Sequence, residues 1–346
     1  MKYYEKAKIK AVPVQDAVGK VLLHDITQIV PDLFKGSSFR KGHIITDADV
    51  EALLNLGKQN IYVAGLNGEV HENDAALRIA RAAMGNGIDI SMPKEGKVGF
   101  SANTCGLLKV NVQALEKLNG VEDVIFATLH TDQPVEVGQE LAGTRVIPLS
   151  IDEKKVEEAE ILCKKYFPII EIKPFAKLDV GLVVTGSEVF SGRIRDGFGP
   201  VVAKKFKDLG SNITRKIIVS DEISMTVSAI KDLLAEGAQM IAVTGGMSVD
   251  PDDLTPAAIR AAGGEIVFYG APVLPGAMFM LAYIGTVPVI GLPGCVMYHR
   301  ASIFDLVVPK LLAGDTLKKT DIVKMGHGGF CASCKECRFP SCSFGK

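Results

Sequence analysis

The chain has 346 residues, a length that corresponds to two or three domains rather than one. With 47% hydrophobic and 23% charged residues, its composition is that of an ordinary folded protein. The formal net charge of -1 gives no overall basic field to attract nucleic acid or an anionic membrane, so we expect partners of neither class.

The first 65 residues predict a small α+β region. Residues 1–10, MKYYEKAKIK, are charged and lack the apolar stretch of a secretory signal, which indicates a cytoplasmic location. Strand-like segments follow, and residues 47–56 predict an amphipathic helix whose apolar side carries Val50, Leu53 and Leu54.

Residues 66–175 predict a mostly β domain, because short β-branched segments are separated by Gly, Asn and Asp. One helix is expected at residues 154–167, before Pro168. The stretch EIKPFAKLD is interpreted as the linker into the next domain, since apolar periodicity begins again at Leu178.

Residues 176–315 predict an α/β domain, because strand-like and helix-like apolar runs alternate along them. In one helix Ile223, Val227, Ile230 and Leu234 recur at spacings of four, three and four residues, which places them on one face. We therefore expect a doubly wound, mostly parallel sheet, preceded by a strand-rich N-terminal region.

The longest uncharged run, residues 277–298, is long enough to span a bilayer as a helix. Its glycines and prolines, Gly285 and Pro288 among them, argue against a helix. Two short strands joined around Gly285 and Thr286 fit better, since strands buried on both faces are apolar throughout. The sequence therefore predicts no membrane span here.

Three glycine-containing loops follow predicted strands of the α/β domain. They are Thr185-Gly186-Ser187-Glu188, Thr244-Gly245-Gly246-Met247-Ser248 and Gly291-Leu292-Pro293-Gly294. Ligands bind at such strand ends in open parallel sheets, where unpaired N–H groups and helix dipoles favour anions. Because glycine lets the backbone approach a bound group closely, the loops predict a phosphorylated ligand. The alternative is that they are ordinary turns.

Three acidic residues follow the second loop: Asp250, Asp252 and Asp253. Beside a phosphate they predict a hard cation such as Mg²⁺, held by one or two carboxylates and by phosphate oxygens. The alternative is helix capping, because Thr255 and Pro256 predict a helix start whose dipole favours nearby acids.

These loops also carry the motifs of a known family. Its Thr-Gly-Asp-Glu-Leu loop corresponds to Thr185-Gly186-Ser187-Glu188-Val189, and its Gly-x-Ile-x-Asp run to Gly192-Arg193-Ile194-Arg195-Asp196. Its Ser/Thr-Gly-Gly-x-Ser-Val loop and following Asp correspond to Thr244, Gly245, Gly246, Ser248, Val249 and Asp253. Its Gly-Leu-Pro-Gly loop corresponds to residues 291–294. Residues 178–313 thus resemble the molybdopterin-binding domain of molybdenum-cofactor biosynthesis proteins, which include the molybdotransferase half of gephyrin.

The resemblance implies a ligand, molybdopterin or its adenylated form, and molybdate insertion or phosphoryl chemistry assisted by Mg²⁺. It implies that Asp253 and Asp196 are catalytic and that Asp253 and Glu188 bind Mg²⁺. It also implies a homo-oligomer and a molybdoenzyme as partner. The implied pterin contacts come from Thr185, Gly186, Ser187, Glu188, Thr244, Gly245, Gly246, Ser248, Pro293 and Gly294.

The chain departs from the family pattern in three places. Cys295-Val296 stands where the family has Asn-Pro after the last loop. Leu274-Pro275-Gly276-Ala277 replaces the family's Lys-Pro-Gly-Lys, so both lysines are absent, and the N-terminal Asp-Asn-Ser-x-Met-Asp-Gly-Tyr motif is missing. These departures favour a non-catalytic cofactor carrier or insertion factor, whereas the retained Asp196 and Asp253 favour an enzyme. A third hypothesis is a nucleotide or pyrophosphate hydrolase that shares the domain, although the N-terminal region does not match such proteins.

The last segment, residues 316–346, is rich in cysteine. Four cysteines, Cys331, Cys334, Cys337 and Cys342, follow the spacing C-x₂-C-x₂-C-x₄-C. This motif is one residue longer than the cysteine motif of a ferredoxin. In a reducing compartment such density indicates metal binding rather than disulfides, with an iron–sulfur cluster or Zn²⁺ as the metal. The alternative is a flexible thiol-rich tail that builds no core of its own.

Overall fold

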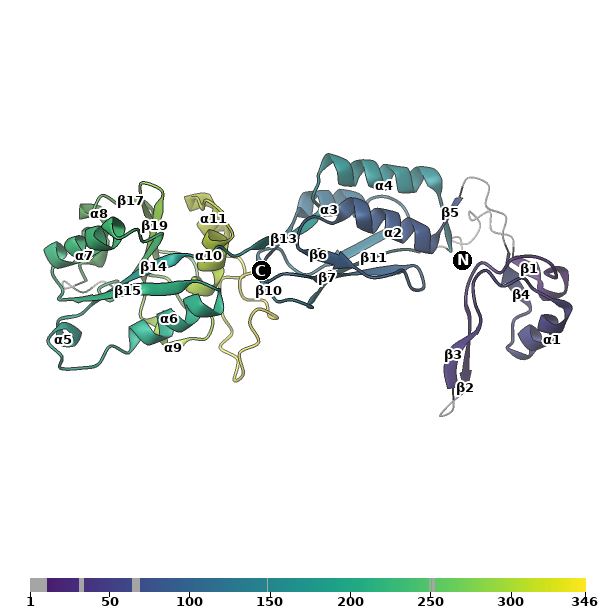
Figure 1. Ribbon diagram of the computed structural model, residues 1–346, viewed down its shortest axis with the longest axis horizontal. Helices are drawn as coiled ribbons and strands as arrows, with labels where there is room; N and C mark the ends of the chain where they lie inside the picture. The colour runs from purple at the N-terminus through teal and green to yellow at the C-terminus, as the bar shows by residue number, and fades with distance from the viewer. Residues whose placement is uncertain (1–10, 31–33, 64–68, 148, 249, 251–252) are drawn as a thin grey trace. The chain divides into compact units, whose positions relative to one another are not determined.

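The computed structural model describes residues 11–30, 34–63, 69–147, 149–248, 250 and 253–346 (Figure 1). The chain divides into two compact units. The first comprises Met1–Thr104, Lys109–Thr131 and Glu136–Ile172, and the second comprises Cys105–Leu108, Asp132–Val135 and Lys173–Lys346. The four-part division predicted from the sequence, 1–65, 66–175, 176–315 and 316–346, stays a prediction.

The first unit begins with small paired elements around one helix. These are β1 (Ala11–Pro13), a 3-10 turn (Val14–Asp16), β2 (Ile26–Val30), β3 (Phe34–Phe39), α1 (Asp47–Asn55) and β4 (Asn60–Tyr62). Strand β1 pairs antiparallel with β4, and β2 with β3. A capping box of Thr46 and Asp49 starts α1, and Leu53 packs from it into a small core. The predicted helix at residues 47–56 is confirmed.

The rest of the first unit is a four-stranded antiparallel sheet with three helices. The elements are β5 (Glu69–His71), α2 (Glu72–Ala83), β6 (Ile88–Ile90), β7 (Lys97–Ala102), α3 (Val112–Asn119), β9 (Val124–Thr128), β11 (Glu140–Val146), β12 (Ser150–Asp152) and α4 (Glu153–Lys165). The sheet order is β6-β7-β11-β9, and β12 pairs with β5. Strand β8 (Gly106–Val110) pairs antiparallel with β10 (Gln133–Val135), and the paired residues of both strands belong to the second unit. Strand β13 spans Ile170–Pro174.

Two of these helices lie where the sequence predicts mostly strands. The buried side of α2 includes Ala75, Ala76, Ile79 and Ala80, so its apolar face consists mainly of alanine. Alanine contributes little to a hydrophobic periodicity although it is the best helix former, which is why the pattern did not reveal α2. The shorter α3 buries only Ala114 and Leu118, which are too few positions to show a helical periodicity.

The second unit contains a six-stranded sheet of order β15-β14-β16-β19-β18-β17. Its strands are β14 (Asp179–Thr185), β15 (Asn212–Val219), β16 (Met240–Thr244), β17 (Glu265–Tyr269), β18 (Met280–Ile284) and β19 (Val287–Leu292). Strands β15, β14, β16 and β19 are parallel, while β18 pairs antiparallel with both neighbours. The run predicted as two buried strands is the hairpin β18–β19, with Gly285 and Thr286 at its turn.

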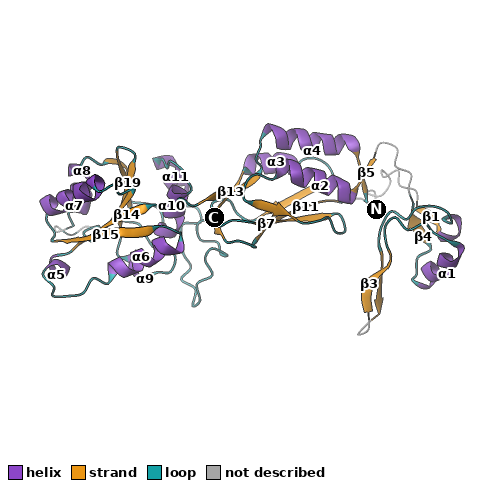
Figure 2. Ribbon diagram, viewed as in Figure 1, coloured by secondary structure: helices purple, strands orange, loops and turns teal. Residues whose placement is uncertain are grey.

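Helices cover both faces of this sheet, as Figure 2 shows for α7 and α8 on one side and α6 and α9 on the other. The helices are α5 (Ser187–Phe190), α6 (Phe198–Asp208), α7 (Ile223–Ala235), α8 (Thr255–Ala261), α9 (Cys295–Tyr298), α10 (Ile303–Leu312) and α11 (Lys319–Lys324). Alternate residues of β14 point to opposite faces. Leu182 packs with Phe206 of α6 and Phe304 of α10, and Val183 packs with Ile230 of α7. The predicted doubly wound, mostly parallel α/β fold is confirmed.

Within the described residues no helix is long and apolar enough to cross a membrane.

Candidate functional site

The predicted loops meet at one edge of the second unit's sheet. From β14 the chain passes to β15 on one side, and it returns later to β16 on the other side. The switch in strand order therefore lies between β14 and β16, where open α/β sheets bind ligands. The register pairs Val184 with Thr244 and Thr244 with Leu292, so the loops after β14, β16 and β19 begin side by side.

The turn after β16 requires glycine at both positions. Gly245 and Gly246 have φ values of 87° and 54°, a conformation that side chains disfavour. A Cβ on Gly245 would also collide with the carbonyl oxygen and the hydroxyl of Thr185. The turn is closed from α8, where the Thr255 hydroxyl donates to the Gly245 carbonyl at 2.8 Å and the Thr255 N–H donates to the Gly246 carbonyl at 3.1 Å.

Thr185 brings an unpaired hydroxyl to the switch point. The residue is 7% exposed, and its Oγ1 has no hydrogen-bond partner within the described part of the chain. Burying a hydroxyl without a partner costs about 1–3 kcal/mol. The same atom lies between the first and second loops, because a Cβ on Gly246 would be 3.5 Å from it. Thr244 differs, since its hydroxyl donates to the Val183 carbonyl at 3.4 Å.

The loop after β14 is held by the neighbouring strand end. The Gly186 N–H donates to the Val219 carbonyl at 3.1 Å, so this N–H is already engaged at the edge of the sheet. Ser187 donates through its N–H to Asp221 Oδ2 at 2.7 Å and through its hydroxyl to the same oxygen at 3.0 Å. Glu188 is exposed, with Oε1 3.2 Å from the position of a Cβ on Gly186. Its carboxylate therefore lies over the Gly186 backbone.

The loop after β19 leaves open space at its glycine. Pro293 is buried, and Gly294 starts α9 with a φ of -53°, which any residue adopts. A Cβ on Gly294 would meet no atom within 4 Å. Neither backbone strain nor a close neighbour explains a glycine here, and an open approach to the backbone fits a bound group.

The loop after β16 continues to Ser248 and Asp253, with Val249, Pro251 and Asp252 outside the described residues. Ser248 is exposed, and Asp253 Oδ2 accepts the N–H of Asp250 at 3.0 Å. From the end of β17 the Tyr269 hydroxyl donates to the Met247 carbonyl at 3.1 Å. Burial and then the Asp253 carboxylate raise the pKa of Tyr269, which keeps this donor protonated.

Asp196 is engaged in structural contacts. Its carboxylate accepts the N–H groups of Phe198 and Gly199 at 2.9 and 2.8 Å, at the start of α6, and pairs with Lys216 Nζ at 2.8 Å. Burial alone would raise the pKa of Asp196, but the Gly199 N–H and the Lys216 ammonium together hold the pKa below its ordinary value. Its side chain is 6% exposed. The Asp196 carboxylate therefore caps the N-terminus of α6.

We expect Asp196→Asn to lower the free energy of unfolding by about 1–2 kcal/mol at neutral pH, because a charged cap and an ion pair are lost. The lowered pKa means that Asp196 stabilises the fold above the ordinary value of 3.8 and that this stability disappears as the pH falls through the lowered pKa. Urea titrations across this range check the result. Asp208→Asn, at an exposed carboxylate of the same helix, should change little.

The predicted magnesium ligands do not form a preformed cluster. In the parts of the chain that the structure describes, no three His, Cys, Asp or Glu side chains converge to hold one ion. Mg²⁺ is often bound through only one or two carboxylates, with phosphate oxygens and water completing its shell. Asp253 and Glu188 therefore fit an ion that arrives with a phosphorylated ligand, and Asp196 has fewer lone pairs to offer.

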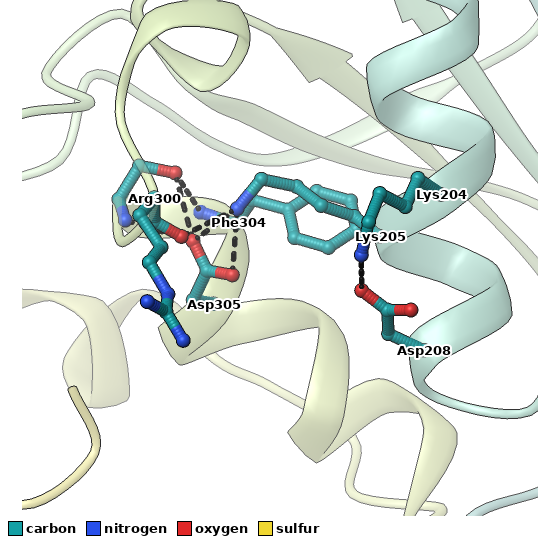
Figure 3. Close-up of polar contacts among 7 residues, drawn as sticks. Lys204, Lys205, Asp208, Arg300, Phe304 and Asp305 are labelled. Atoms are coloured by element: carbon teal, nitrogen blue, oxygen red, sulfur yellow. Dashed lines mark hydrogen bonds and ion pairs between the residues drawn. The ribbon is translucent and has the colours of Figure 1, made fainter. Parts of the chain in front are cut away.

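A cavity of about 580 Å³ lies beside α6, α9 and α10 rather than at Thr185 and Gly245. Its lining includes Lys205 and Asp305, which form a buried ion pair (Figure 3). Lys205 Nζ lies 2.8 and 2.9 Å from the two Asp305 oxygens and also donates to the Arg300 carbonyl at 2.9 Å. The helices α9 and α10 follow the Gly291–Gly294 loop directly. The contacts of Lys205 therefore hold in place the segment that leads out of this loop.

Several residues that shape the site were not predicted to do so: Tyr269, Asp221 and Lys216 were given no role, and Thr255 only that of a helix start. These four residues act through partners between 10 and 34 positions away in sequence. The available signal was position: Asp221 and Tyr269 stand at or just after the ends of β15 and β17, at the same edge of the sheet as the glycine loops.

A doubly wound sheet with glycine turns at its switch point defines a ligand-binding domain of the open α/β class. Residues 181–313 match the family described as "Probable molybdopterin binding domain", and residues 11–65 match a domain of unknown function, DUF8806. The second unit thus contains a divergent member of the molybdopterin-binding family.

Relatives match this chain over limited lengths. A CinA-like protein from Mycobacterium sp. is 36% identical over 88 residues, which are 25% of this chain and 21% of the relative. A molybdopterin molybdenumtransferase from Synechococcus elongatus is 26% identical over 120 residues, 32% of this chain and 30% of the relative. The chain therefore spans between a fifth and a third of these curated relatives.

Solved structures are similar to parts of the chain as well. The molybdopterin biosynthesis enzyme MoaB from Thermus thermophilus is 18% identical, with a TM-score of 0.33, over 41% of this chain and 99% of that protein. A molybdenum cofactor biosynthesis protein from Pyrococcus furiosus is 14% identical, with a TM-score of 0.26, over 90% of this chain and 66% of that protein.

Proposed function

We propose that the second unit binds molybdopterin or its adenylated form at the edge formed by Thr185, Gly245 and Gly294, and that the protein acts in molybdenum cofactor biosynthesis. The membership of residues 181–313 in the molybdopterin-binding family supports the ligand. The single observation that carries the proposal is the buried Thr185 hydroxyl without a partner in the described residues, at the strand-order switch.

The arrangement suits a phosphate group. Within the described residues, the N–H groups of Gly245 and Gly246 have no backbone acceptor, and both glycines leave the turn open to close approach. A phosphate oxygen at this turn would accept hydrogen bonds from these N–H groups and from the Thr185 hydroxyl. The phosphate would thereby give the buried hydroxyl the hydrogen-bond partner that the described residues do not provide. Asp253 and Glu188 would hold Mg²⁺ against the same phosphate and lower its negative charge during group transfer.

Thr185→Val tests the ligand site. Valine keeps the shape of threonine and removes only the hydroxyl, so the fold should be retained while ligand affinity falls about tenfold, the loss of one charge-assisted hydrogen bond. We would produce the protein in a host that makes the cofactor, oxidise it, and measure pterin fluorescence per chain. Thr144→Val is the matched control, because Thr144 is buried in the first unit and donates to the Ile125 carbonyl.

Wild-type protein that releases no fluorescent pterin after anaerobic preparation would contradict the proposal. Equal pterin content in Thr185→Val and wild type would remove Thr185 from the site while leaving the family-level ligand in place.

The second candidate is a carrier or insertion factor that hands the cofactor to a molybdoenzyme. It is favoured by Asp196, whose carboxylate is already committed to a helix cap and to Lys216. Incubation with adenylated molybdopterin, molybdate and Mg²⁺ separates the two candidates. Turnover that Asp253→Ala abolishes identifies a transferase, and binding without turnover identifies a carrier. We also propose a homo-oligomer in the cytoplasm, which light scattering and cell fractionation would examine.

A further inference from the structure

The cysteine-rich tail is folded against the second unit. The Cys331 N–H donates to the Leu274 carbonyl at 2.8 Å, and the Leu274 N–H donates to the Gly329 carbonyl at 2.8 Å, so the tail runs beside the segment after β17. Near its end Phe344 is 3% exposed and belongs to the same core as Phe304 of α10. The tail therefore extends the core of the α/β domain.

All four tail cysteines line one cavity of about 240 Å³. Cys331, Cys337 and Cys342 are half-buried and pack against the core, whereas Cys334 is exposed. The turn between the first two cysteines includes Ser333, whose φ of 50° lies in the left-handed region. A segment that is exposed at Cys334 and lines a cavity with all four of its cysteines has the arrangement of a binding site as well as packing contacts.

The geometry does not suit a single zinc ion. Zn–S bonds of about 2.3 Å in a tetrahedron bring the sulfurs to about 4 Å from one another. In the described chain no three cysteine, histidine or acidic side chains converge on one ion. Cysteine sulfurs that ligate a polynuclear cluster stand further apart, at the outer corners of a larger inorganic body. Four cysteines that line one cavity supply the four thiolates that such a cluster needs.

The surroundings also suit a negatively charged cluster. Arg300 and Arg338 line the same cavity, together with His299 and the aromatic rings of Tyr298 and Phe339. A cluster ligated by four thiolates carries net negative charge, which nearby guanidinium groups stabilise. The Arg300 carbonyl accepts a hydrogen bond from Lys205 of α6, which also pairs with Asp305 of α10 (Figure 3). These contacts fix the backbone position of Arg300.

We propose that Cys331, Cys334, Cys337 and Cys342 bind a [4Fe–4S] cluster in this cavity. The site lies beyond α9, on the part of the chain that follows the Gly291–Gly294 loop, and it is independent of the pterin proposal.

The full chain, purified without oxygen and incubated with ferrous iron, sulfide and a thiol reductant, tests the site. We expect about four iron and four sulfide per chain after desalting, with a broad visible absorption that dithionite bleaches. Less than one iron per chain overturns the proposal. So does a colourless protein that binds one zinc per chain in place of iron, and so do two disulfides in the protein as purified.

Two variants and a control connect the iron to the tail. Cys334→Ser changes an exposed side chain and Cys337→Ser a half-buried one, and each should reduce bound iron at least fourfold. Cys105→Ser, an exposed cysteine outside the tail, should keep the wild-type iron content. Circular dichroism of Cys334→Ser separates loss of the cluster from loss of the fold. Unchanged iron in both tail variants overturns the assignment.

Discussion

Lys205→Met is expected to lower the free energy of unfolding by about 3–5 kcal/mol. Lys205 contacts both oxygens of Asp305, and the two side chains are only 13% and 17% exposed. Burial raises the pKa of Asp305 above its ordinary value in spite of the Lys205 ammonium, which shows how costly this charge is inside the fold. Methionine would leave the carboxylate buried without its cation. Urea unfolding at neutral pH measures the loss.

The adjacent residue supplies the control. Lys204 pairs with Asp208 at 2.6 Å on the surface, where the side chains are 74% and 59% exposed, so Lys204→Met should cost less than about 0.5 kcal/mol (Figure 3). The pH dependence gives a second check. A raised carboxyl pKa favours the protonated form in the folded state, so the loss in Lys205→Met should shrink as the pH falls. Equal losses in both variants would refute a buried pair.

Continuous apolar runs were sufficient to predict the strands of the second unit because these strands are buried on both faces, as Met240 to Val243 show. The helix α7 was also predicted, but its buried face carries Thr226, Ala229, Ile230 and Leu233, whereas Ile223 of the predicted face is exposed. Patterns this strong leave few alternatives. The first unit has weaker patterns, since α2 faces its sheet with alanine, and so the sequence predicted strands where a helix lies.

The site residues could be predicted where their role depends on neighbours within one loop. They could not be predicted where their role depends on which strands pair in the sheet. Gly245 and Gly246 follow a strand directly, and their dihedral angles confirm that the turn needs glycine. Ser187 was expected to face the ligand, but its donors reach Asp221, which is 34 positions away and is brought near by the pairing of β14 with β15. No local pattern indicates such a partner.

Gly245→Ala is expected to destabilise the protein by about 2–5 kcal/mol and to abolish pterin binding. About 1–2 kcal/mol comes from a side chain in the left-handed region, and the remainder comes from collision of the new Cβ with Thr185. That collision displaces the hydroxyl on which the proposed function rests. Thermal unfolding and pterin fluorescence per chain measure the two effects.

Gly237→Ala is the control that separates the cost of the left-handed backbone from the cost of the collision with Thr185. Gly237 has a φ of 89°, close to the 87° of Gly245, but a Cβ there meets nothing within 4 Å. It should therefore cost only about 1–2 kcal/mol and leave pterin content unchanged. If both variants lose the same stability, the close approach of Gly245 to Thr185 is not real. If Gly245→Ala folds and keeps its pterin, the ligand lies elsewhere, and the cavity beside α6 and α9 becomes the alternative site.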